Sequence, residues 1–289
     1  MTDPLLTPAA PDQGQGREAS LRVVSFNLFS GRSLVDGQVV DDRMTQAVAG
    51  TGADVLALQE VDHFQPRSGG TDQAALAAAA IGAVDHRFVG LVHGTPGVPG
   101  WRPVGSGHVN DATVHAGGAA HLGDEPSYGV ALASRLPVES WHVLHLNPAR
   151  GRYPMPIPSR PPSLIWLHDE PRAVLAAVLR SPRMTVACTH LSFVPGVNVF
   201  QLRAVRRWLE ALPGPRVLLG DLNLPGRLPS RLTGWTPLVT GPTYPSPGPR
   251  TQLDHALASD LPAGARWQGS VAQLAISDHR AITVDLQLG

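Results

Sequence analysis

Several residue types that carry common functions are scarce in this chain of 289 residues. It contains no lysine and one cysteine, Cys188. A single cysteine excludes an intramolecular disulfide and a cysteine-rich zinc site. Its place in the apolar run "MTVACTH" predicts a buried core residue. The formal net charge is zero, which argues against coating long nucleic acid by bulk charge but leaves room for a local arginine cluster.

Long apolar stretches are also missing. No run approaches the ~18 residues of a membrane span, so we expect no stable membrane insertion. The N-terminus, "MTDPLLTPAAPDQGQGREAS", lacks a basic start followed by an apolar block and does not resemble a signal peptide. Its composition predicts a disordered leader over residues 1–20, followed by one domain over residues 21–289. We therefore expect a cytoplasmic protein, and nothing in the sequence indicates a protein partner.

Short apolar runs with strand character recur along the chain, several of them apolar almost throughout, as in strands covered on both faces. They cover residues 21–26, 54–59, 87–92, 128–134, 141–146, 172–179, 183–190, 216–221, 253–259 and 280–288. Helices are predicted in three segments, around 41–50, over 71–82 and over 197–212. In the second of them, Thr71 is the predicted N-cap and Gly82 the predicted C-cap. Residues 93–127 and 147–171 are expected to be irregular. The mixture predicts an α/β domain with sheet-on-sheet packing.

Polar residues stand where six of these strands begin or end. They are Asn27, Glu60, His190, the pair Asp221 and Asn223, Asp254, and the pair Asp278 and His279. One polar strand end is ordinary, because Asp and Asn favour turns. The loops at strand ends converge in sheet proteins, however, so a set of six restricted to Asn, Glu, Asp and His predicts a site.

Part of this set suits a metal ion. Glu60, Asp278 and Asn27 offer hard oxygen atoms, which are the ligands that Mg²⁺ or Mn²⁺ prefers. The remaining members suit proton transfer. His190 and His279 can donate hydrogen bonds or protons to an anion.

The aspartates in this set suit other roles in catalysis. Asp221 could take a proton from water, and Asn223, on the same strand face, could orient that water or a phosphate. Asp254 could hold His279 in one tautomer. Gly220, which precedes Asp221, would leave room for the backbone to approach the phosphate. A metal, a water-activating carboxylate and two histidines together describe hydrolysis of a phosphate ester.

The same residues form an ordered signature. The stretches are "SFNLFSG" (25–31), "LALQEVD" (56–62), "GVALASRLPV" (129–138), "THL" (189–191), "GDLN" (220–223), "LDHALAS" (253–259) and "SDHRAI" (277–282). In this order they resemble the endonuclease/exonuclease/phosphatase superfamily, whose members share the pancreatic-deoxyribonuclease-like fold. The resemblance implies an α/β four-layer sandwich, with two mixed β-sheets packed face to face and helices on the outside.

The resemblance also implies roles for these residues. A divalent metal, Mg²⁺ or Mn²⁺, would be held mainly by Glu60, with Asn27 and Asp278 close by. Asp221 and Asn223 would position or activate the attacking water. The family has one-metal and two-metal schemes that assign Asp221 and His279 differently, so the identity of the general base stays open.

The two histidines would act on the phosphate. His190 would stabilise the phosphoryl oxygens, and His279, paired with Asp254, would do the same or protonate the leaving group. "RSGG" after the metal glutamate resembles one branch of the superfamily and would make Arg67 a phosphate contact. "EPRAVL" (170–175) similarly directs Arg172 into the cleft. His255 departs from the family pattern and is expected to point away from the site.

We therefore expect a metal-dependent hydrolase that cleaves a phosphodiester by metal-assisted water attack and is nuclease-like, with DNA or RNA as candidate substrates. A phosphatase or a sphingomyelinase-type phosphodiesterase acting on a small or lipid substrate is the alternative, and "THL" fits both readings. A non-catalytic binding module of the same fold is a third reading. It is disfavoured because the metal and histidine positions are all filled.

Overall fold

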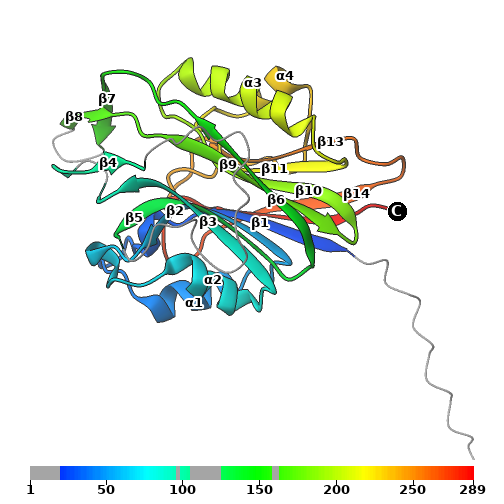
Figure 1. Cartoon of the computed structure of the whole chain (residues 1–289), viewed down its shortest axis with the longest axis horizontal. Coiled ribbons are helices and arrows are strands. Elements are labelled where there is room, and N and C mark those ends of the chain that lie inside the picture. Colours follow the sequence, from blue (N-terminus) through cyan, green and yellow to red (C-terminus); the bar gives the residue numbers. More distant parts are fainter. Residues whose placement is uncertain (1–19, 96–97, 105–124, 158–162) are drawn as a thin grey trace, which may run out of the picture.

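Four layers make up the part of the chain that the computed structural model describes, which is residues 20–95, 98–104, 125–157 and 163–289. Figure 1 shows two β-sheets face to face, with α1 (Asp41–Ala49) and α2 (Gln73–Ile81) outside one sheet and α3 (Val197–Leu209) and α4 (Leu228–Thr233) outside the other. This confirms the α/β sandwich expected from the sequence. The predicted leader lies, except for its last residue, outside the described residues.

The first sheet contains seven of the described strands, in the order β14-β15-β1-β2-β5-β3-β4. β1 and β2 run parallel, and every other neighbouring pair is antiparallel. Its strands are β1 (Leu21–Asn27), β2 (Val55–His63), β3 (Asp85–His93), β4 (Arg102–Pro103), β5 (Ser127–Ser134), β14 (Arg266–Ala272) and β15 (Ala281–Gln287).

The second sheet contains six described strands, in the order β12-β13-β11-β10-β9-β6. It repeats the same plan, because β10 and β11 are parallel and the other pairs are antiparallel. Its strands are β6 (Val138–Leu146), β9 (Arg172–Arg180), β10 (Arg183–His190), β11 (Arg216–Asp221), β12 (Thr236–Pro237) and β13 (Asp254–Ser259).

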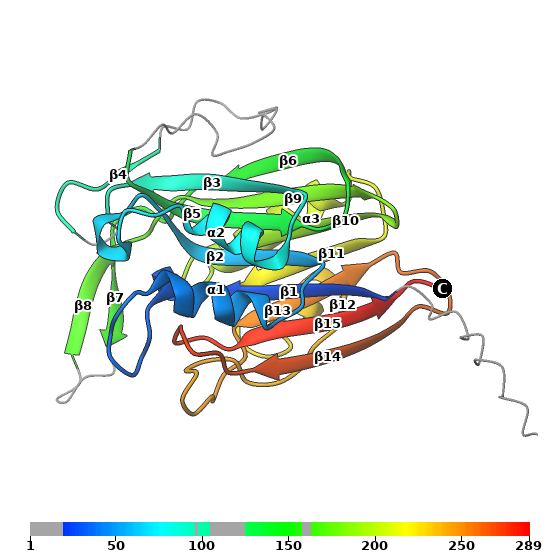
Figure 2. The ribbon, with the colours of Figure 1, turned by 90° about the horizontal axis from the view of Figure 1, so that it is seen from below.

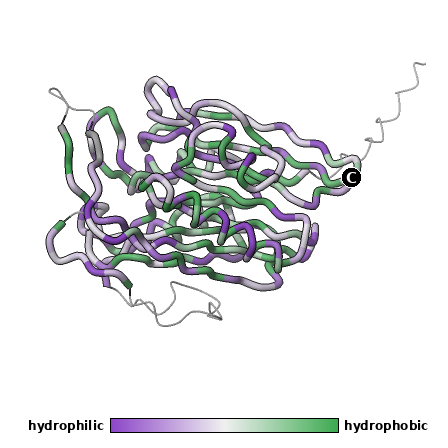
Figure 3. The backbone as a smooth tube through the Cα atoms, turned by 90° about the horizontal axis from the view of Figure 1, so that it is seen from above, coloured by the Kyte–Doolittle hydropathy of each residue, from purple (hydrophilic) through white to green (hydrophobic). Residues whose placement is uncertain are grey.

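Apolar side chains fill three spaces between the four layers. Between the sheets, Val23 and Val55 of the first sheet belong to the same buried cluster as Leu175, Val186 and Val217 of the second, together with Cys188. The outer faces are buried too, against α1 and α2 on one side and α3 and α4 on the other. Figure 2 shows α1 and α2 lying over the first sheet, and Figure 3 shows hydrophobic residues concentrated along the central strands. Burial on both faces explains why these strands are apolar almost throughout.

The three predicted helices are present as α1 (Asp41–Ala49), α2 (Gln73–Ile81) and α3 (Val197–Leu209). Gly82 ends α2 in the left-handed conformation, with φ +68°, as expected for its C-cap. The predicted N-cap at Thr71 is wrong. Asp72 is the N-cap, and its side chain accepts a hydrogen bond from the Ala75 backbone nitrogen.

Some elements were not predicted. A short helix, α4 (Leu228–Thr233), two 3-10 turns, η1 (Phe29–Gly31) and η2 (Pro66–Ser68), and the edge strands β4, β12 and β14 fall outside the apolar runs. The segment 147–171, expected to be irregular, contains a separate two-stranded ribbon of β7 (Arg152–Ile157) and β8 (Ser163–His168). Proline lacks an N–H donor and so hides the strand pattern of β7, but an isolated ribbon tolerates it because one strand edge needs no partner.

Among the described residues, no helix is both long enough and apolar enough to cross a membrane.

Candidate active site

The site lies where the two parallel strand pairs end. Because parallel strands present their carboxyl ends at one edge, β1 and β2 bring Asn27 and Glu60 together, and β10 and β11 bring His190 and Asp221 together. Antiparallel neighbours begin at the same edge, so Asp254 at the start of β13 lies directly opposite Asp221. The turn before β15 carries Asp278 and His279 in the same way.

Asn27 links the two sheets at this edge. Its Nδ2 donates to Glu60 Oε1 at 3.0 Å and to Asp221 Oδ2 at 3.2 Å. Its Oδ1 accepts from the Phe29 backbone nitrogen at 3.1 Å, and this contact fixes the amide orientation. The nitrogen of Asn27 therefore faces the carboxylates, while its oxygen retains one lone pair.

Glu60 sits in a strained backbone position. Its φ is +54°, and the pairing of β2 with β5 shifts register between Leu58 and Val61, which marks a bulge. Such a bulge re-aims a side chain at the cost of a left-handed residue, and both features are common at functional sites. Burial raises the pKa of Glu60 from 4.5 to about 7, opposed by the Asn27 hydrogen bond and reinforced by the Asp278 carboxylate.

Asp221 is the centre of the acid–base groups. Its Oδ2 lies 3.2 Å from Asn27 Nδ2, 3.5 Å from His190 Nε2 and 3.7 Å from His279 Nε2. Its Oδ1 accepts from the Asn223 backbone nitrogen at 3.0 Å. Burial raises the pKa of Asp221, and the charge of His279 opposes the rise.

Asn223 and His190 lie beside this carboxylate. Asn223 has a left-handed φ of +50°, and its Nδ2 donates to the Leu191 carbonyl oxygen at 3.0 Å and lies 3.3 Å from His190 Nε2. Burial, followed by the nearby positive charges of Arg172 and His279, lowers the pKa of His190 well below its usual value. His190 is therefore a neutral imidazole at physiological pH.

His279 is held by a buried carboxylate. Its Nδ1 lies 2.9 Å from Asp254 Oδ2, and the Tyr244 ring packs against it at 4.8 Å between centroids. Burial lowers the pKa of His279, but the carboxylates of Asp254 and Asp221 outweigh burial and raise it. His279 consequently carries a proton at neutral pH, with its Nε2 directed toward Asp221.

Two sets of residues could hold a metal ion. Glu60 and the half-buried Asp278 form one set, a pair of carboxylates, with the nitrogen rather than the predicted oxygen of Asn27 facing Glu60, and burial raises the pKa of both acids. Asp221, Asp254 and His279 form a second, with one ligand atom of each within 4.8 Å of the others. The second set already has a hydrogen bond between His279 Nδ1 and Asp254, so at least one of its atoms carries a proton.

Arg67 and Arg172 are both paired with carboxylates. Arg67 donates through Nε and Nη2 to the fully buried Asp62 at 2.8 and 2.6 Å, and its guanidinium lies over the Tyr128 ring. Arg172 is buried, with Nη2 3.6 Å from Asp169 Oδ1 and 3.8 Å from Glu170 Oε2.

Sequence reasoning missed some of these neighbours. Glu170, whose pKa is raised by burial, could have been found because it lies two residues before Arg172 in "EPRAVL". Tyr128 carried no such signal. His255 is buried on the opposite strand face from Asp254, with Nε2 2.8 Å from the Leu224 carbonyl oxygen, which agrees with the expectation that it points away. At Gly220 the space for a side chain is taken by the Thr189 carbonyl oxygen of β10, 1.9 Å from an added Cβ, rather than kept open for a phosphate.

Comparison with known proteins places this geometry in a family. The sequence profile of the Endonuclease/Exonuclease/phosphatase family matches residues 24–279. No curated protein matches the chain significantly. A solved endonuclease/exonuclease/phosphatase from Beutenbergia cavernae is 23% identical, with a TM-score of 0.59 over 93% of this chain and 72% of that one.

Two further structures share the fold. Sphingomyelinase C from Streptomyces griseocarneus is 16% identical, with a TM-score of 0.55 over 92% of this chain and 99% of that one. Truncated TDP2 from Caenorhabditis elegans is 15% identical, with a TM-score of 0.54 over 93% and 97%. The chain belongs to the Endonuclease/Exonuclease/phosphatase family, whose members are phosphoesterase hydrolases.

Proposed function

We propose that the chain is a divalent-metal-dependent phosphodiesterase of nuclease-like specificity, with residues 21–289 forming one catalytic domain. The observation that carries the proposal is the convergence on Asp221 Oδ2 of Asn27, His190 and His279 from both sheets, beside the half-buried Glu60. A structural role alone would not require two histidines and four carboxylates to converge at the same end of the two sheets.

The residues fit a hard divalent ion, and enzymes of this family depend on one. The negative charge of Asp278 raises the free energy needed to ionise Glu60. A cation between the two carboxylates would remove this repulsion. Glu60 and Asp278 would hold Mg²⁺ or Mn²⁺, and Asn27 would position the Glu60 carboxylate through its Nδ2, because its Oδ1 is turned to the Phe29 backbone. When bound, the ion would polarise the phosphoryl oxygen and neutralise developing charge.

Asp221 is the proposed general base. Its carboxylate is fixed by Asn27 and by the Asn223 backbone, which aims it into the space between the two histidines. Since His279 already holds a proton, it cannot accept one from water, and this supports Asp221 as the acceptor. Asn223 would help to orient the water.

The histidines would act on the phosphate. His279, protonated and oriented by Asp254, would donate to the leaving-group oxygen or a phosphoryl oxygen. His190, a neutral imidazole, would donate an N–H to a phosphoryl oxygen. Arg67 and Arg172 would contact the substrate phosphate. Asp62 holds the Arg67 guanidinium over the Tyr128 ring, and Asp169 lies 3.6 Å from Arg172 Nη2.

One observation favours a second candidate, a phosphodiesterase acting on lipid. The β7–β8 ribbon exposes Leu164 and Trp166 by 56% and 59%, and its base leads directly into Asp169 and Arg172. Exposed apolar residues beside a site suit an interfacial substrate. The likeness to Sphingomyelinase C is compatible with this reading. A cytoplasmic location remains our proposal for the nuclease-like enzyme, whereas a lipid enzyme would act at a membrane surface.

A substrate panel tests the proposal. Single- and double-stranded DNA and RNA, sphingomyelin vesicles, a phosphomonoester and bis(p-nitrophenyl) phosphate should be compared with Mg²⁺ and with Mn²⁺. We expect cleavage of nucleic acid, and a loss of roughly 10³-fold in Glu60→Ala, because metal charge stabilisation is worth several kcal/mol. Glu139→Ala, on the exposed face of β6, is the matched control.

The outcomes separate the candidates. Hydrolysis of the aryl diester and sphingomyelin without nuclease activity would replace the nuclease proposal with the lipid one. Absence of activity on every substrate, together with no Mn²⁺ binding by calorimetry, would leave a non-catalytic module. A Glu60→Ala variant as active as the control would refute the proposed metal site.

A further inference from the structure

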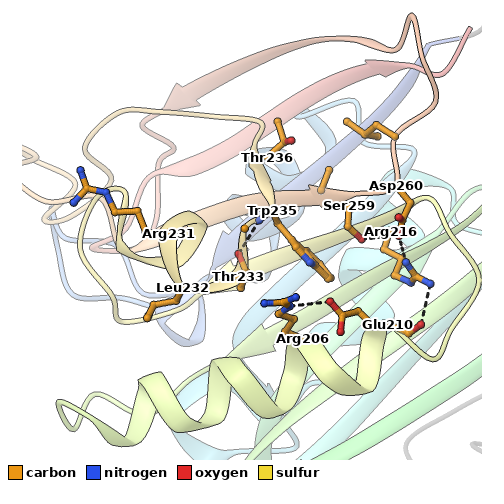
Figure 4. A pocket seen from close by; sticks show the side chains of 13 residues that line it. Arg206, Glu210, Arg216, Arg231, Leu232, Thr233, Trp235, Thr236, Ser259 and Asp260 are labelled. Atoms are coloured by element: carbon orange, nitrogen blue, oxygen red, sulfur yellow. Dashed lines mark hydrogen bonds and ion pairs between the residues drawn. The ribbon is translucent and has the colours of Figure 1, made fainter.

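An arginine-rich groove runs along α3, on the outer face of the second sheet. Its volume is about 540 Å³, and it is lined by Phe200, Arg203, Arg206 and Arg207 of α3, by Glu210 at the C-cap of that helix, and by Leu232 of α4. It continues into a second hollow of about 930 Å³ that shares Arg206, Glu210 and Leu232 and adds Arg216, Arg231, Trp235 and Asp260. Figure 4 shows Arg206 and Glu210 facing Trp235 across this second hollow.

The positive charge of the groove is only partly balanced. Arg206 donates to Glu210 at 2.8 Å, and Arg216 is paired with Asp260. Within the described parts of the chain, Arg203, Arg207 and Arg231 have no acidic partner. Because the whole chain has a formal net charge of zero, these arginines create a local surplus suited to an anion.

Phe200 adds an aromatic ring to the same surface. It is 71% exposed, and with Arg203 and Arg207 it follows the spacing of one helix stripe. Adjacent positions on such a stripe lie ~5–6 Å apart, a separation comparable to that of successive phosphates on a single strand. An exposed ring among unpaired arginines is the combination that binds single-stranded nucleic acid, by stacking on bases and pairing with phosphates.

The N-terminal end of α3 is anchored beside the active site through its buried face, while the stripe lies on its exposed face. In the first turn of α3, Asn198 Nδ2 donates to the carbonyl oxygen of Asn223 at 2.9 Å. The next turn carries Gln201, which accepts from the Ser192 backbone nitrogen at 2.8 Å just beyond His190. A strand that leaves the site along the exposed face of α3 would meet Phe200 near the start of the helix, and then Arg203 and Arg207.

We propose that α3 is a docking track for single-stranded nucleic acid extending from the catalytic site, with Phe200 stacking on a base and Arg203 and Arg207 binding successive phosphates. This inference rests on the proposed nuclease-like function and gives it a substrate class. An acidic polypeptide is the competing occupant, and it differs because it would not need the phenyl ring for stacking.

Direct binding tests the track without catalysis. In a Glu60→Ala background, fluorescence anisotropy would follow a labelled oligonucleotide long enough to reach Arg207. Arg203→Gln/Arg207→Gln and Phe200→Ala should each weaken its binding about tenfold. The double variant should also reduce the salt slope by about 1.4, since a single strand contributes ~0.7 for each neutralised phosphate. Arg266→Gln, an exposed arginine of the edge strand β14, is the matched control.

Turnover of a small substrate distinguishes an effect on the track from an effect on the catalytic site. With Glu60 intact, the double variant should keep the wild-type kcat/KM for bis(p-nitrophenyl) phosphate, which is too small to reach Arg203 and Arg207. An equal loss on this small diester and on the oligonucleotide would overturn the inference, because the change would then act on the site or the fold.

Three other results would overturn it as well. One is unchanged oligonucleotide affinity in both variants. Another is competition by polyglutamate with no effect of Phe200→Ala, which would assign the groove to an acidic polypeptide. The third is no oligonucleotide binding by any variant. If the aryl diester is still hydrolysed in that third case, the phosphodiesterase function survives while its nucleic-acid class and the track both fail.

Discussion

Replacing Glu60 by glutamine should stabilise the metal-free protein, and increasingly so as the pH rises. Burial raises the pKa of Glu60 from 4.5 to about 7, so the folded state holds a proton that the unfolded state releases. Stability falls with pH wherever the native state binds more protons. The loss contributed by this carboxyl group is absent below the unfolded pKa, grows between the two pKa values and is complete above the folded one.

The size of the effect follows from the two pKa values. At 1.36 kcal/mol for each pH unit, the ionised carboxylate costs the wild type up to about 3 kcal/mol above pH 7 and about 1 kcal/mol near pH 5. Glutamine has no charge to bury and can still accept from Asn27 through its amide oxygen. The difference in unfolding free energy between Glu60→Gln and wild type should therefore increase by about 2 kcal/mol between pH 5 and pH 8.

Urea unfolding in EDTA at these two pH values measures this difference. Glu139→Gln, on an exposed strand face, is the control and should show no such trend. Adding Mg²⁺ at pH 8 should reverse the ranking, because the ion stabilises only the protein that retains its ligand. A stability difference that does not change with pH, or an equal gain from Mg²⁺ in both proteins, would refute the reasoning.

Three further substitutions test the fold around the site. Gly220→Ala should lower the unfolding free energy by more than about 3 kcal/mol, because an added Cβ would lie 1.9 Å from a backbone oxygen of β10; a loss below about 1 kcal/mol in urea would contradict that contact. Asp72→Ala should cost about 1 kcal/mol by removing the N-cap of α2, with a smaller loss for Thr71→Ala, and equal losses would reject this cap. Arg67→Ala should cost about 3 kcal/mol because it leaves the buried Asp62 charge unpaired. Adding Asp62→Asn should restore much of it, and thermal unfolding showing no recovery would disprove the coupling.

Much of the fold could be predicted from the sequence because it depends on burial. Central strands such as β9 and β10 are buried on both faces, so their apolar runs are long and unambiguous. The edge strand β14 is exposed along most of its length, so no hydrophobic pattern marks it. The β7–β8 ribbon was missed for a different reason, since its prolines oppose strand formation locally and only the pairing of two segments makes it.

The candidate site was also only partly predictable from the sequence. The strand-end positions of Asn27, Glu60 and Asp221 could be located because a polar residue after an apolar run is visible in the sequence. What each side chain faces could not be predicted. The amide nitrogen of Asn27, rather than its oxygen, points at the two carboxylates, and this depends on a hydrogen bond from the Phe29 backbone.

The bridge made by Asn27 has a consequence for how activity is lost. Glu60 belongs to one sheet and Asp221 to the other, so each sheet carries half of the proposed catalytic set. A small sliding of one sheet over the other would separate the halves while leaving every strand paired within its own sheet. Heating or mild denaturant should therefore abolish turnover before circular dichroism changes, which makes catalysis a sensitive reporter of how well the two sheets are aligned.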